Sequence, residues 1–194
     1  MRFIGFYDYT VILTYMSLVS AVLGTIFAHK GIFGAAMLCL FLSGFCDAFD
    51  GKVARTKKNR TDDEKAFGIQ LDSLCDVVSF GMAPAFSLYC MGVDSVAGII
   101  ILCAYCVCAV IRLAFFNVQE AKRQQVESGA NKYYRGLPVT TSALIFPVYY
   151  LLKPLLPGKF FVTGLYLLAA VTAFLFVLDF KVKKPGLGKI PATK

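Results

Sequence analysis

The amino-acid sequence predicts an all-α integral membrane protein, built as a bundle of six transmembrane helices with both termini in the cytoplasm. The composition is the first observation: 58% of the 194 residues are hydrophobic and only 16% are charged, against about 45–50% and about 25% in soluble domains. The mean hydropathy of +0.67 agrees with this. The charged residues also gather between long uncharged windows. Together these observations exclude a disordered chain, a fibrous repeat and most soluble folds.

Each expected transmembrane helix corresponds to a window without Asp, Glu, Lys or Arg. Every window is close to the roughly 17–25 residues that a spanning helix needs. The six windows are residues 10–29, 31–46, 77–93, 95–111, 136–152 and 160–178. We therefore expect a single membrane domain at residues 1–185, followed by a flexible basic tail at 186–194.

Local signals mark the ends of these helices. Residues 1–9 carry four aromatic side chains and predict a short interfacial helix, with a frayed end as the alternative. A very short turn near residues 29–31 joins the first two helices. Asp94 and Ser95 can cap the fourth helix, Pro138 suits the first turn of the fifth, and the proline- and glycine-containing stretch 153–158 separates the fifth helix from the sixth.

The basic residues predict the orientation of the bundle. Of the 20 Lys and Arg residues, 16 fall on the side of the N-terminus, the 47–68 and 112–136 connections and the tail. The other side has only Lys30, Lys153 and Lys159, and Arg112 is expected within the membrane. The positive-inside rule therefore predicts a multi-pass protein of the cell membrane whose basic side faces the cytoplasm. The net charge of +8 is then explained by topology and anionic lipids, and no pattern indicates nucleic acid.

Four aspartates next to the 47–68 connection are the candidate functional residues. Asp47 and Asp50 are three residues apart, and Asp72 and Asp76 are four apart, so each pair shares one face of a helix. Like charges at this spacing repel each other, and a divalent cation would neutralise them. Carboxylates without a nearby histidine suit Mg²⁺ or Mn²⁺, with Ca²⁺ as a further option. Four carboxylates can hold two ions, which is an arrangement that clamps a phosphoryl group.

Small residues and one arginine accompany the aspartates. Gly51 and Ala54 follow the first pair, Gly68 precedes the second, and small side chains allow a ligand or another backbone to approach closely. Arg55 adds a planar donor fork for phosphate oxygens. These residues predict a pyrophosphate site at the cytoplasmic interface. The alternative is a solvated helix end, as we expect for Asp62, Asp63 and Glu64.

The pattern Asp47-x-x-Asp50-Gly51-x-x-Ala54-Arg55, followed by Gly68-x-x-x-Asp72-x-x-x-Asp76, resembles the signature of the CDP-alcohol phosphotransferases. The resemblance implies that the four aspartates bind two divalent metal ions and that Asp76 is also the general base. It implies that the glycines and the alanine contact the nucleotide, while Arg55 faces the phosphates. The family usually has eight residues between the arginine and the next glycine. Here residues 56–67 make twelve, and we expect an enlarged cytoplasmic loop.

Further segments resemble the bacterial, integral-membrane phosphatidylserine synthases within that family. They are LDSLCDVVSFGMAP at 71–84, RLAFFNV at 112–118 and YRGLP at 134–138, although Phe115 stands where a basic residue is common. The resemblance implies transfer from CDP-diacylglycerol to L-serine, giving phosphatidylserine and CMP in a membrane-embedded homodimer. The alternatives are another acceptor, such as glycerol phosphate, inositol or inositol phosphate, and, in another class, a small cation channel or transporter.

The expected acceptor pocket has five candidate residues. Serine is a zwitterion, so its carboxylate needs a cationic partner, for which the sequence offers Arg112, Lys132 and Arg135; a snorkelling role is the alternative for Arg112. Asn117 is a candidate hydrogen-bond partner for serine, with a helix C-cap as the alternative. Ser79 continues the face of Asp72 and Asp76, and it either lines the pocket or serves as a small packing residue.

Overall fold

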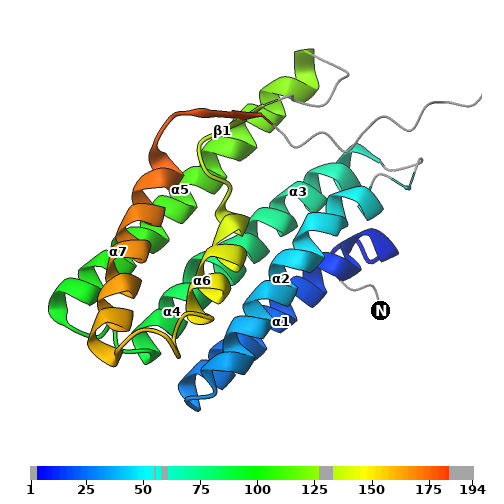
Figure 1. Cartoon of the computed structure of the whole chain (residues 1–194). Helices are drawn as coiled ribbons and strands as arrows, with labels where there is room; N and C mark the ends of the chain where they lie inside the picture. The colour runs from blue at the N-terminus through cyan, green and yellow to red at the C-terminus, as the bar shows by residue number, and fades with distance from the viewer. Residues whose placement is uncertain (1–3, 55, 58–60, 127–132, 184–194) are drawn as a thin grey trace, which may run out of the picture.

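The computed structural model describes residues 4–54, 56–57, 61–126 and 133–183. Within them, five helices are long and apolar enough to cross a membrane. The helices run side by side as an elongated bundle (Figure 1). Arg55, Lys132 and the expected tail at 186–194 lie outside the described residues.

The first two helices form a tight hairpin. A 3₁₀ turn, η1 (Tyr9–Val11), leads into α1 (Ile12–His29), and α2 (Phe33–Ala54) returns after a three-residue turn. The turn expected near residues 29–31 is confirmed, and Gly31 adopts the φ of +75° that it requires. The expected N-terminal interfacial helix is wrong, because residues 4–8 are not helical. Gly5 has a φ of +116°, and the Asp8 side chain caps η1 by accepting the Thr10 N–H.

The third span is a continuous helical rod with a change of pitch in the middle. It consists of α3 (Asp62–Asp76), the π-helical turn η2 (Val77–Met82) and α4 (Ala83–Cys90). Thr61 and Glu64 form a reciprocal capping box at its start. The rod therefore begins at Asp62, well before the window 77–93, and the second half of the enlarged loop expected at 56–67 is helix. Asp62, Asp63 and Glu64 do lie in the first turn of a helix, where their charges suit the helix dipole.

The π turn has specific partners on neighbouring helices. Its wider turns break the regular hydrogen-bond ladder, and the Phe80 carbonyl accepts hydrogen bonds from Tyr105 Oη at 2.7 Å and Ser142 Oγ at 3.4 Å. The Tyr105 ring is fully buried against Phe146 and Phe176. The turn is therefore held in the centre of the bundle by two other helices.

The remaining spans are α5 (Val96–Val126) and α7 (Gly158–Val177), which pack together. Ser95 caps α5 by accepting the Gly98 N–H at 3.1 Å, as the sequence predicts. With 31 residues, α5 is about 46 Å long, so it extends beyond a hydrocarbon layer of about 30 Å. In α7, Leu165, Ala169 and Phe176 are buried while Leu167 and Phe174 are exposed. Apolar side chains thus cover the exterior, as lipid contact requires.

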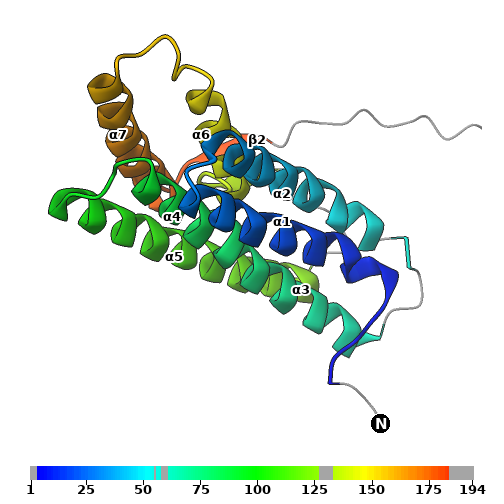
Figure 2. The same cartoon turned by 90° about the horizontal axis from the view of Figure 1, so that it is seen from below.

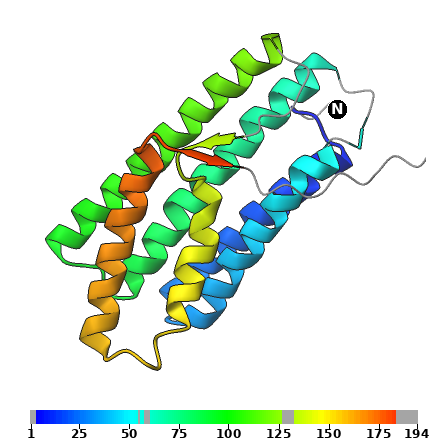
Figure 3. The same cartoon turned by 45° about the horizontal axis from the view of Figure 1, so that its top comes forward.

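A short helix and a small β-ladder complete the fold. The 3₁₀ turn η3 (Val139–Thr141) and α6 (Ser142–Tyr150) form an apolar helix shorter than the other spans. β1 (Tyr133–Arg135) pairs antiparallel with β2 (Lys181–Lys183), joining the segment before α6 to the segment after α7 (Figure 3). The all-α expectation therefore holds for the bundle but did not include this ladder. Seen from below, α1 and α3 lie beside each other and α7 lies at the opposite side (Figure 2).

Candidate active site

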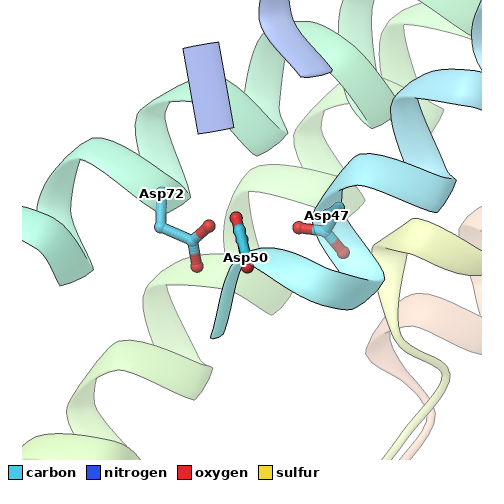
Figure 4. A group of neighbouring side chains, drawn as sticks. All are labelled: Asp47, Asp50 and Asp72. Atoms are coloured by element: carbon cyan, nitrogen blue, oxygen red, sulfur yellow. The ribbon is translucent and has the colours of Figure 1, made fainter. Parts of the chain in front are cut away.

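Three aspartates from two helices meet near one end of the bundle. Asp47 and Asp50 lie in the last two turns of α2, and Asp72 lies in the last turns of α3. One carboxylate oxygen from each lies within 4.8 Å of the others, and the three side chains point toward a common space (Figure 4). The aspartate pair of α2 and the aspartate pair of α3 therefore face each other, as their helical spacing predicts.

Asp76 extends this group toward the π turn. Its side chain is only 8% exposed, and its carboxyl group is hydrogen-bonded to that of Asp47. Asp50 and Asp72 form a second carboxyl pair. Two carboxyl groups in hydrogen-bond contact require either a shared proton or a nearby cation, because two bare negative charges repel strongly in a buried place.

The chemistry of the group suits a hard divalent cation. Its donors are all carboxylate oxygens, which Mg²⁺ and Mn²⁺ prefer. Asp72 Oδ1 is buried and has no hydrogen-bond partner in the part of the chain that the structure describes, and buried oxygens without a partner are unusual. An ion held by Asp47, Asp50 and Asp72 would satisfy this oxygen, so the residues present fit such a group.

A cavity of about 220 Å³ opens beside these carboxylates. Its wall includes five residues that the sequence analysis assigned to the site: Asp50, Gly51, Ala54, Gly68 and Asp72. It also includes five that the sequence did not single out for the site: Thr10, Val11, Thr14, Lys65 and Ile69. A Cβ added to Gly51 would have no neighbour within 4 Å, so this glycine leaves the cavity open. A Cβ on Gly44 would overlap with Ala143 of α6, so that glycine serves helix packing.

The threonines of the cavity come from η1, which contains Thr10, and from the first turn of α1, which contains Thr14. Thr14 Oγ1 donates a hydrogen bond of 3.1 Å to Asp50 Oδ2. A lone threonine in an apolar helix gives no functional signal in one sequence, because such residues usually bond their own helix. Its position one turn after Thr10 on the first helix becomes informative only when α1 is packed against α2.

The N-terminal segment closes one side of this region. Lys57 Nζ binds Asp8 Oδ2 at 2.8 Å and Glu64 Oε1 at 3.0 Å, and the Phe6 ring packs edge-on against Phe67 at 5.5 Å. The hydrogen bonds from Lys57 and from Thr10 lower the pKa of Asp8 to about 2. The same ion pairs raise the pKa of Lys57. Residues 4–11, which we call the N-terminal strap, are thus bound to the α2–α3 connection and to α3.

The candidates for the acceptor pocket lie in different places. Ser79 is fully buried in η2, and its hydroxyl has no partner among the described residues. Asn117 accepts a hydrogen bond of 2.9 Å from Ser73 of α3. It lies inside α5, which continues to Val126, so it is not a helix C-cap. Of Arg135 the structure describes the backbone, in β1.

Arg112 is buried rather than snorkelling to the surface. It is 7% exposed, and its Nε donates a hydrogen bond of 3.2 Å to the Leu137 carbonyl. It lines a cavity of about 450 Å³ with Phe115, Phe176 and Asp179, whereas Asn117 lines a cavity of about 290 Å³ between α3 and α5. Within the described residues, neither of these two cavities is lined by one of the four aspartates. The structure therefore gathers Asp50, Gly51, Ala54, Gly68 and Asp72 around one cavity. It does not place Arg112 and Asn117 in that cavity.

Comparison with known proteins agrees with the motif. The family model described as CDP-alcohol phosphatidyltransferase matches residues 9–181. A Saccharomyces cerevisiae CDP-diacylglycerol–serine O-phosphatidyltransferase is 41% identical over 115 residues, which are 58% of this chain and 40% of that protein. The archaetidylserine synthase of Methanothermobacter thermautotrophicus is 33% identical over 141 residues, covering 72% and 56% of the two chains.

A third relative, the CDP-diacylglycerol–serine O-phosphatidyltransferase of Bacillus subtilis, is 40% identical over 90 residues, covering 45% of this chain and 49% of that protein. The chain thus spans about half the length of the curated relatives it matches. No solved structure matches it significantly.

Proposed function

Since this chain belongs to the CDP-alcohol phosphatidyltransferase family, we propose that it transfers the phosphatidyl group of CDP-diacylglycerol to the hydroxyl group of L-serine. The observation that carries the proposal is the cavity beside Asp50 and Asp72, whose wall contains Gly51, Ala54 and Gly68 of the signature. The relatives described above are named for transfer to serine or for archaetidylserine synthesis, which supports serine as the acceptor.

The donor's cytidine diphosphate group would bind in this cavity. Gly51 has open space where a side chain would stand, so the backbone of α2 can approach the nucleotide closely. The signature assigns Arg55 to the phosphates, and its guanidinium fork suits them. The diacylglycerol tails would lie along the apolar exterior of the bundle, on the side chains that would face the lipid bilayer.

The transfer itself needs a base and compensation of negative charge. Asp47, Asp50, Asp72 and Asp76 would hold two Mg²⁺ or Mn²⁺ ions, which supply charge compensation for the pyrophosphate and the leaving CMP. The Asp76 carboxylate accepts the proton of the serine hydroxyl while the serine oxygen forms a bond to the lipid-side phosphorus. The bond from that phosphorus to the CMP oxygen breaks, so the products are phosphatidylserine and CMP. The burial of Asp76 beside Asp47 supports its assignment to this site.

We propose a six-crossing topology for the complete bundle. Because β1 pairs with β2, both strands lie on the same side of the membrane, and the chain between them crosses an even number of times. α7 provides one crossing, so α6 and its flanking residues provide the other. The excess of basic residues supports a cytoplasmic location for the ladder and the aspartates in the cell membrane. The homodimer implied by the family resemblance stays a prediction.

An acceptor panel tests the proposal. Purified protein in detergent receives CDP-diacylglycerol, Mn²⁺ or Mg²⁺ and one acceptor: L-serine, glycerol 3-phosphate, inositol or inositol phosphate. We expect CMP release with L-serine alone. Release with another acceptor would overturn serine specificity but keep the reaction class, and no release from folded protein with any acceptor would contradict the proposed reaction.

Asp76→Asn tests the proposed base in the same assay. We expect almost complete loss of CMP release, because the amide is nearly isosteric but accepts no proton. Asp63→Asn is the matched control, since Asp63 lies in the exposed first turn of α3. Normal turnover by folded Asp76→Asn protein would remove this residue from the mechanism.

A further inference from the structure

We infer that Thr14 is a positioning residue for Asp50: its hydroxyl holds one carboxylate oxygen, so that the carboxylate is set for a divalent cation. This inference rests on the proposed function, because it takes Asp50 as a metal ligand. The residue lies on α1, outside the signature that spans α2 and α3. It would make the first helix a part of the metal site rather than only a neighbour in packing.

The contact is specific and buried. Thr14 is 6% exposed and Asp50 is 9% exposed, and the hydrogen bond of 3.1 Å joins residues 36 positions apart in the sequence. A hydroxyl group donates one hydrogen bond, and here it donates to the carboxylate of another helix instead of to its own backbone. The bond fixes Asp50 Oδ2, and it leaves Oδ1 and the remaining lone pairs for other partners.

Metal ligands generally need such support. Side chains that orient a ligand from behind change metal affinity by about 10–100-fold when they are removed. Asp50 needs this support, because it lies close to the like charges of Asp47 and Asp72 and near the end of α2. A hydroxyl donor stabilises the carboxylate without adding a positive charge that would compete with the cation.

The same pair of helices offers a matched control. Ser17, one turn after Thr14 on α1, is 3% exposed and shares a hydrogen bond of 2.8 Å with Ser43 of α2. Ser17→Ala therefore removes one buried hydrogen bond between α1 and α2, as Thr14→Val does, but it leaves every carboxylate untouched. Comparing the two variants separates support of Asp50 from support of the hairpin.

The experiment measures Mn²⁺ binding directly, without either substrate. Free Mn²⁺ is followed by electron paramagnetic resonance during titration of the purified full-length protein in detergent. We expect Thr14→Val and Thr14→Ala to raise the Kd for Mn²⁺ by about 10-fold, with Thr14→Ser and Ser17→Ala close to the unchanged protein. If the valine variant does not fold, the alanine variant decides.

A second readout uses turnover with L-serine. We expect Thr14→Val to need more Mn²⁺ for half-maximal CMP release, with kcat largely restored at saturating Mn²⁺. An unchanged Kd for Mn²⁺ in both hydroxyl-free variants would overturn the inference while leaving the proposed function intact. Equal losses in Thr14→Val and Ser17→Ala would also overturn it, since they would indicate a packing effect. Absence of Mn²⁺ binding in the unchanged protein would instead contradict the proposed metal site.

Discussion

Two of the glycines on α2, Gly44 and Gly51, should respond in opposite ways to the same substitution. Gly51→Ala places a methyl group where the structure has nothing within 4 Å, and alanine is favoured over glycine in a helix by about 1 kcal/mol. The unliganded protein should therefore keep its stability or gain up to about 1 kcal/mol. Because Gly51 lines the cavity proposed for the donor, the methyl group should obstruct the nucleotide and raise the KM for CDP-diacylglycerol about 10-fold, the equivalent of about 1.4 kcal/mol.

Gly44→Ala is the reference for a glycine that serves packing. Its Cβ would come closer to Ala143 Cβ than the 3.0 Å that real Cβ atoms keep, so α2 and α6 must separate. Overpacking of this kind costs about 1–3 kcal/mol. We expect a lower unfolding temperature for Gly44→Ala, together with a KM for the donor that changes less than in Gly51→Ala.

Both quantities can be measured on the same preparations. The chain has no tryptophan but has seven cysteines, so a thiol-reactive dye reports thermal unfolding in detergent. CMP release at varied CDP-diacylglycerol gives KM and kcat. An unchanged KM in Gly51→Ala would refute the assignment of this cavity to the donor, and a strongly lowered unfolding temperature would refute the open geometry at Gly51.

The remaining predictions concern the polar residues Asp72, Ser79 and Asp8. Asp72→Asn should raise the Mn²⁺ concentration needed for half-maximal CMP release, since one carboxylate of the cluster is lost; an unchanged Mn²⁺ titration would contradict the metal assignment. Ser79→Ala should raise the unfolding temperature, because it removes a buried hydroxyl without a partner among the described residues, which costs about 1–3 kcal/mol. A fall in kcat/KM for L-serine in this variant would support a place for Ser79 in the acceptor pocket. Asp8→Asn should free the N-terminal strap from Lys57 and speed limited proteolysis near the N-terminus, while Asp94→Asn at the far end of the bundle serves as the control. For Asp8 itself, the depressed pKa means that its ion pair is fully present above about pH 4 and is lost as the pH falls through about 2, so acid should accelerate the same cleavage in the unchanged protein.

The spacing of charged and apolar residues predicted most of the bundle and the meeting of the aspartates from two helices. Uncharged windows located the spans, because a bilayer penalises charge wherever it occurs. Helical periodicity placed Asp47 with Asp50 and Asp72 with Asp76, and the packed helices do turn the first three of these toward one another. The signature also led to Gly51, Ala54 and Gly68, which line the cavity beside the aspartates.

The misses have separate physical causes. Thr61 and Glu64 carry a capping-box signal, but charged residues next to it suggested a loop, and the start of α3 was placed too late. Aromatic residues near the N-terminus suggested a helix over residues 1–9. In the structure Gly5 has a positive φ and Asp8 is the N-cap, so the first helical residue is Tyr9. The contact between Thr14 and Asp50 depends on which helix packs beside α2. A single sequence does not contain that information.

The π turn at Val77–Met82 changes the helical phase of the sequence between α3 and α4. The wider π turn takes up about one extra residue, which in a regular α-helix would rotate everything beyond it by about 100° around the axis. The carboxylates of Asp72 and Asp76 before the turn and the packing surface of α4 after it therefore follow different helical phases. Tyr105 and Ser142 hold the turn at the Phe80 carbonyl, so the phase offset has a fixed location. A deletion of one residue within the turn would allow a continuous α-helix that keeps the same face of α4 against α1, but it would remove the widened turn at Phe80.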